Sequence, residues 1–178
     1  MSMSSAAIAT FEIGLTALSG PLEKAEAHAA AAAAAAACKI DAAVLLGTRL
    51  FPDMFPLTRQ IQIACDLANN GSARLAGIEA PKHEDTEQTF GELKARIAKT
   101  VAFVKGLEPA KIDASAGREI VFPLGRETKA RTRGVDYLNH FLLPNFYFHI
   151  STAYGILRHC GVQIGKRDYL GGIPMTVS

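Results

Sequence analysis

Apolar residues recur at three- and four-residue steps in four long stretches of the sequence, and this pattern limits the fold more than any other feature. The clearest stretch covers residues 90–106, where the apolar positions are Phe90, Leu93, Ile97, Val101 and Val104. This spacing is typical of one face of an α-helix. Acidic residues within 83–87 precede it, and negative charge near a helix N-terminus is favourable. The sequence therefore predicts an amphipathic helix over 90–106, with Arg96 on one of its polar sides.

The first stretch, residues 4–38, shows the same spacing. Its apolar positions are Phe11, Leu15, Leu18, Leu22 and Ala25. Gly20 and Pro21 interrupt it and predict a kink, because proline lacks an N–H and clashes with the preceding turn. The alanine run 29–37 prolongs the helix, since alanine has the highest helix propensity. Whether this run serves close helix packing or is only low-complexity sequence stays open at this point.

The second helix is expected over residues 54–75, with Asp53 as its N-cap. Its apolar stripe consists of Leu57, Ile61, Ala64, Ala68 and Leu75. At about 100° per residue, the centre of this stripe falls near Gln60. Gln60 is therefore expected in the interior, whereas Gln62 and Asp66 plot towards the far edge and are expected in solvent.

The last helix is expected over residues 135–159, broken or kinked at Pro144 and ending before Gly161. Between the third and last helices, the β-branched and aromatic run 120–122 is followed by a glycine-containing turn and alternating Thr and Arg, which predicts either a small hairpin or a long ordered crossover. Four long helices with one long crossover predict an all-α, four-helix bundle that forms a single domain over residues 1–178.

Composition excludes several classes of protein. Apolar residues make up 49% of the 178 residues and charged residues 20%, which is usual for a globular protein. The net charge of +2 is not the clustered basic excess of a nucleic-acid binder, and no apolar run is long enough for a membrane span. The cysteines, Cys38, Cys65 and Cys160, form no CxxC pair, and the N-terminus lacks the pattern of a signal peptide. We therefore expect a cytoplasmic protein with free, mostly buried thiols.

A polar row is expected along the last helix, at the border of the core. Its members are Asn145, His149 and Thr152, and Gln60 could meet them from the second helix. His149 could be a metal ligand or a catalytic base, or a structural histidine satisfied by Asn145, Gln60 or a backbone carbonyl. The sequence has no HxxxH, ExxH or HExxH, and a zinc site normally needs three or four protein ligands. GxSxG and the Walker and Rossmann phosphate loops are absent as well.

Three segments resemble a known bacterial family. They are FPDMFPLTRQIQIACD, then RLAGIEAP followed by DTEQTF, and LPNFYFHISTAYGILRHCGVQIGKRDYLG. They are similar to a family of uncharacterised proteins in the DinB/YfiT-like superfamily of metalloenzymes. The resemblance implies an up-down-down-up four-helix bundle, usually a homodimer.

The resemblance also implies where a divalent metal would bind. Typical DinB-like proteins use one histidine on the second helix and an HxxxH pair on the last. The pair falls at positions 145 and 149, where this chain has Asn145 and His149, and the other position falls near Gln60 or Gln62. One of the three histidines therefore remains in this chain.

Three functional hypotheses follow. The first is an uncharacterised DinB-like bundle with a degenerate metal pocket, which is non-enzymatic or binds an unknown small ligand and has no metal cofactor. The second is a Zn-, Ni- or Mn-dependent transferase or hydrolase in which His149 is joined by Asn145, water and a carboxylate such as Asp66 or Asp53. The third is a stress-linked binding module whose basic crossover contacts an acidic partner through Arg126, Lys129, Arg131 and Arg133. We expect no nucleic-acid or membrane partner in any of them.

Overall fold

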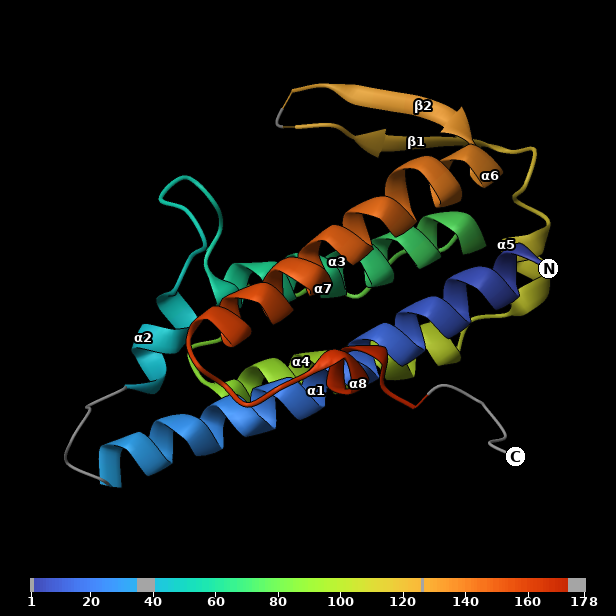
Figure 1. Ribbon diagram of the computed structural model, residues 1–178. Helices are drawn as coiled ribbons and strands as arrows, with labels where there is room; N and C mark the ends of the chain where they lie inside the picture. The colour runs from blue at the N-terminus through green and yellow to red at the C-terminus, as the bar shows by residue number, and fades with distance from the viewer. Residues whose placement is uncertain (1, 35–40, 126, 173–178) are drawn as a thin grey trace.

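The computed structural model describes residues 2–34, 41–125 and 127–172. The chain is mostly helical, and its four longest helices lie lengthwise in two layers (Figure 1). They are α1 (Met3–Ala34), α3 (Leu57–Ala76), α4 (Phe90–Lys105) and α7 (Leu143–His159). In one layer α3 packs against α7, in the other α1 packs against α4, and further contacts join α3 to α4 and α1 to α7. None of the described helices is both long and apolar enough to cross a membrane.

The first helix continues through Gly20 and Pro21, where the sequence predicts a kink. The side chains on both sides of the proline hold it in place, because Leu15, Leu18 and Leu22 are all buried in the core. One missing hydrogen bond is a small loss beside this burial. The alanine run is helical as far as Ala34, and the rest of it, together with Cys38, lies outside the described residues.

The predicted start of the second long helix is wrong by three residues. After the short helix α2 (Ala42–Gly47), the chain makes a turn, and α3 begins at Leu57 with Pro56 as its N-cap. A proline disfavours helical geometry in the residue before it, so Phe55 cannot continue a helix into Leu57. Asp53 consequently lies exposed in the turn and caps nothing.

The predicted helix over residues 90–106 and the predicted hairpin are confirmed. Thr89 and Glu92 form a capping box at the start of α4. After the short helix α5 (Pro109–Asp113), strands β1 (Glu119–Pro123) and β2 (Lys129–Arg133) pair antiparallel and lie along one end of the helices (Figure 1). Ile120 and Phe122 point inward, and Phe122 packs its ring on those of Tyr137 and Phe141.

The last long helix is not broken at Pro144. It runs without a gap through α6 (Gly134–Asp136), the π-helix η1 (Tyr137–Leu142) and α7. Pro144 lies inside this continuous helix, directly after the π-helical segment. Gly161 follows with the left-handed φ of 86° that ends such helices. The chain then buries Val162 and Ile164 and forms α8 (Lys166–Leu170) against α1, whereas Ile173 lies outside the described residues.

Candidate functional site

Gln60 and His149 form the centre of the candidate site. Gln60 belongs to α3 and His149 to α7, and His149 Nδ1 lies 2.7 Å from Gln60 Oε1. Both side chains are buried, with exposed fractions of 1% and 9%. Gln60 Nε2 donates to the carbonyl of Phe55 at 3.0 Å, which leaves Oε1 as the atom that faces His149. An amide oxygen only accepts, so Nδ1 carries the proton and donates it to Gln60.

This hydrogen bond defines the chemistry of the other ring nitrogen. Burial, with a smaller contribution from the positive charge of Arg59, lowers the pKa of His149 from 6.5 to about 4. The imidazole is therefore neutral at pH 7, with its lone pair on Nε2. Nε2 makes no hydrogen bond with any residue that the structure describes. It can accept a proton, a hydrogen bond or a metal ion.

The lowered pKa of His149 predicts a loss of stability in mild acid. Between pH 6.5 and 4 the unfolded chain binds a proton at this side chain and the folded chain does not. We therefore expect the free energy of unfolding to fall by about 2–3 kcal/mol over this range. Urea midpoints measured from pH 7 to 5 will show the effect, since that window lies above the titration of the carboxylates.

His149→Asn is the control for this titration, because asparagine offers a donor near the position of Nδ1 but has no titrating group. The wild type should lose more stability than His149→Asn between pH 7 and 5. Parallel curves for the two proteins would contradict the neutral, buried state of His149.

Asn145 and Thr152 do not join this pair. Asn145 Nδ2 donates to the carbonyl of Phe141 at 2.6 Å, and Thr152 Oγ1 donates to that of Phe148 at 2.7 Å. Each side chain thus bonds its own helix one turn back, as short polar side chains on helices often do. Of the four residues expected to meet, the structure joins only Gln60 to His149 by a hydrogen bond.

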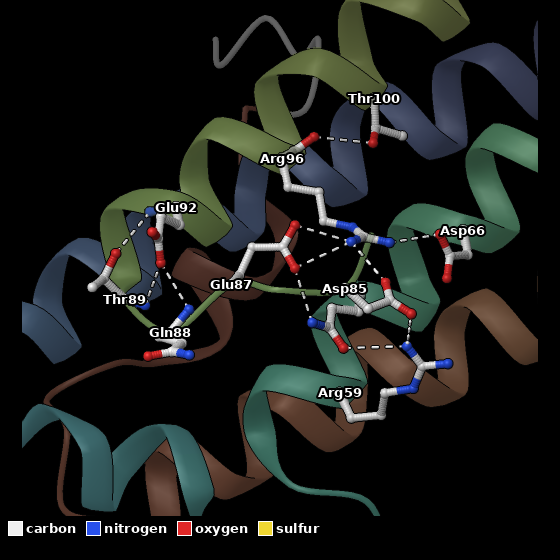
Figure 2. A network of polar contacts seen from close by, with 10 residues as sticks. Arg59, Asp66, Asp85, Glu87, Gln88, Thr89, Glu92, Arg96 and Thr100 are labelled. Atoms are coloured by element: carbon white, nitrogen blue, oxygen red, sulfur yellow. Dashed lines mark hydrogen bonds and ion pairs between the residues drawn. The ribbon is translucent and has the colours of Figure 1, made fainter. Parts of the chain in front are cut away.

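A buried ion-pair network lies nearby on the other side of α3, and it corrects three predictions. The side chain of Arg96, expected on a polar side of its helix, is only 1% exposed. Its Nη2 contacts Asp66 Oδ1 at 2.7 Å, and its Nη1 contacts Asp85 Oδ1 at 2.8 Å and Glu87 Oε1 at 3.0 Å (Figure 2). Asp66 and Gln62, expected in solvent, therefore face this network, and Gln62 is 4% exposed.

The network ties down the loop over residues 77–89, which we call the strap. Asp85 of the strap contacts both Arg96 and Arg59, and Glu87 accepts from Gln62 Nε2 at 2.9 Å. Asp85 has a φ of 55°, the only positive φ of a non-glycine residue in the described part of the chain. Such a conformation is uncommon and persists where surrounding contacts hold it. Asp85 and Glu87 of the strap thus pair with arginines, whereas the sequence suggested that the acidic residues favour the start of α4.

Burial and pairing with arginines shift the pKa values of the carboxylates in the network in opposite directions. Burial alone would raise the pKa of Glu87 and Asp85, but hydrogen bonds from the arginines outweigh it, and the pKa of each is lowered. At Asp66 burial prevails over Arg96, and the pKa is raised. Burial also raises the pKa of Cys65 to about 12, so this thiol stays protonated and is no nucleophile.

The residues present do not fit a metal site of the kind that the resemblance implies. Within residues 2–34, 41–125 and 127–172, no three His, Cys, Asp or Glu side chains are placed to hold a metal ion. Asp66 is paired with Arg96, and Asp53 is exposed in its turn. His149 therefore lacks the carboxylate partners that the metalloenzyme hypothesis gave it.

The basic residues of the hairpin are exposed and partly paired. Arg131 lies 3.6 Å from Glu119, and Arg133 lies 2.8 Å from Asp136. Arg126 lies outside the described residues. These contacts are compatible with a charged strand edge that prevents pairing with another chain, and they are equally compatible with a binding surface.

Comparison with known proteins identifies a matching family and similar solved structures. Residues 3–170 match a family described as a domain of unknown function (DUF1993). The crystal structure of a DinB family member protein from Shewanella denitrificans is 41% identical to this chain, with a TM-score of 0.85, over 98% of this chain and 95% of that one. No curated protein matches the sequence.

Proposed function

The chain belongs to the DUF1993 family of domains of unknown function, and from this premise we propose that it is a DinB-like four-helix bundle with a degenerate metal pocket that binds a small ligand at His149 without a metal. The similarity to a DinB family member supports the DinB-like bundle. Binding, and not catalysis, is proposed because His149 offers one open nitrogen and, among the described residues, its ring is hydrogen-bonded only to the amide of Gln60.

The hydrogen bond between Gln60 and His149 is the observation that carries this proposal. It joins His149 to Gln60, one of the two residues near which the resemblance places the second-helix histidine, and its 2.7 Å length leaves no room for an ion between the two atoms. Because Gln60 holds the proton on Nδ1, the Nε2 atom of His149 is a fixed acceptor. A ligand that donates a hydrogen bond to Nε2 would give both ring nitrogens of His149 a hydrogen-bond partner.

Metal analysis and two variants of His149 test the proposal. We expect purified protein to stay free of zinc, nickel and manganese after incubation with each ion. His149→Ala should lower the free energy of unfolding by about 1–3 kcal/mol, since it leaves the buried amide of Gln60 unpaired. His149→Asn keeps a hydrogen-bond donor for Gln60, and its free energy of unfolding should fall clearly less than that of His149→Ala.

Elemental analysis and thermal unfolding give the readouts. Stoichiometric metal that disappears in His149→Asn would overturn the proposal and favour the metal-dependent transferase or hydrolase. A melting temperature unchanged by His149→Ala would show that the Gln60–His149 hydrogen bond does not hold the pocket together.

A further inference from the structure

Arg59 lies next to the Gln60–His149 pair and was not expected there. It precedes Gln60 on α3, and its charge is close enough to His149 to help keep the imidazole neutral. Its side chain is 37% exposed and therefore reaches the solvent. A cation beside an open, neutral acceptor offers two different contacts to one small molecule.

The strap and α3 bind the guanidinium of Arg59 through one nitrogen, Nη1. Its Nη1 donates to Asp85 Oδ2 and, at 3.2 Å, to Gln62 Oε1. Within the described residues, Nε and Nη2 make no hydrogen bond, and this part of the guanidinium points away from Asp85 (Figure 2). A guanidinium fixed at one nitrogen keeps free donors for an anion, and it loses little conformational freedom when the anion binds.

The side chain of Phe148 supplies an apolar surface beside His149. Phe148 is 54% exposed, and its ring stands perpendicular to that of His149 with the two centres 5.2 Å apart. Phe55, whose carbonyl accepts from Gln60, is 52% exposed. Large apolar side chains beside a few polar groups are typical of sites for small organic ligands.

We propose that Arg59 selects an anion at the His149 site and that the ligand is a small hydroxy acid with an apolar body. Its carboxylate pairs with the free edge of Arg59, its hydroxyl donates to His149 Nε2, and its apolar body covers Phe148. Asp85 and Gln62 act as positioning residues through Arg59. This inference rests on the proposed function, since it assigns a ligand class to the same nitrogen of His149.

Three aromatic probes separate the contacts. Mandelate has the carboxylate, the hydroxyl and an apolar ring, phenylacetate lacks the hydroxyl, and benzyl alcohol lacks the carboxylate. Titrations followed by calorimetry and by amide chemical shifts should show saturable binding of mandelate. We expect phenylacetate and benzyl alcohol each to bind about tenfold more weakly, because each leaves one contact unmade.

Variants assign each contact to its residue. Arg59→Met should weaken mandelate about tenfold and leave benzyl alcohol unchanged, while Arg59→Lys, which keeps the charge, should recover part of the affinity. His149→Asn should reduce mandelate to the affinity of phenylacetate. Lys99→Met, at an exposed position on α4, is the matched control and should change nothing.

The outcomes distinguish this inference from the proposed function. Benzyl alcohol binding as tightly as mandelate, or mandelate binding unchanged by Arg59→Met, would overturn the role of Arg59 and leave His149 as the binding residue. No saturable binding of mandelate would overturn the ligand class. Metal at His149 would overturn the proposed function itself, whatever the probes show.

Discussion

Replacing Arg96 with methionine is expected to lower the free energy of unfolding by about 3–5 kcal/mol. Its guanidinium is buried and contacts three carboxylates, of Asp66, Asp85 and Glu87, on two separate segments of the chain. Methionine fills much of the same volume but removes the cation that the three carboxylates share, and Arg59 pairs only with Asp85 among them. The loss comes from the stranded charges and exceeds the effect of an exposed ion pair, which is usually below about 1 kcal/mol.

Arg96→Lys refines the test, since an ammonium keeps the charge but cannot reach several carboxylates with separate nitrogens. The free energy of unfolding of Arg96→Lys should lie between those of the wild type and Arg96→Met. Urea unfolding at pH 7 measures each difference, and Lys99→Met on the same helix should change stability by less than about 0.5 kcal/mol. Equal losses for Arg96→Met and Lys99→Met would show that the network contributes no more than solvated charges do.

Replacing Gly134 with alanine is expected to cost about 3 kcal/mol or more. An added Cβ would lie 2.1 Å from the carbonyl oxygen of Ser115, which is a backbone atom and cannot turn aside. The close approach is fixed on both sides, because Gly134 N donates to Arg118 O at 2.9 Å and Val135 N donates to Ala116 O at 3.1 Å. The loop before β1 and the start of α6 would have to move apart.

Gly91 provides a control, because alanine at this position is expected to raise stability. It lies exposed in the first turn of α4, and a Cβ there would meet nothing nearer than Thr89 Oγ1 at 3.9 Å. Gly91→Ala should therefore raise stability by about 0.5–1 kcal/mol, since alanine favours the helix. Thermal unfolding of both variants checks the pair, and a small loss in Gly134→Ala would mean that the loop before β1 yields easily.

Helical periodicity predicted most of the fold, since the stripes along α1, α3 and α4 are the buried faces. It also placed Gln60 in the interior, because an amide at the centre of an apolar arc can point nowhere else. Arg96 and Gln62 were missed for a physical reason. Their partners lie in the irregular strap, and a helical pattern carries no information on which polar side chains a loop will cover. The uninterrupted helix at Pro21 depended likewise on packing from other elements.

The π-helix before α7 has a consequence for the rotation of the last helix. A π-helical turn takes up one residue more than an α-helical turn, so it shifts the angular phase of everything after it by about 100°. At one end of this continuous helix Tyr137 faces Phe122 of the hairpin, and at the other end His149 faces Gln60. A uniform α-helix with the same residues would satisfy one of these contacts and turn the other away. The wider turn therefore sets the phase that lets one helix serve both partners.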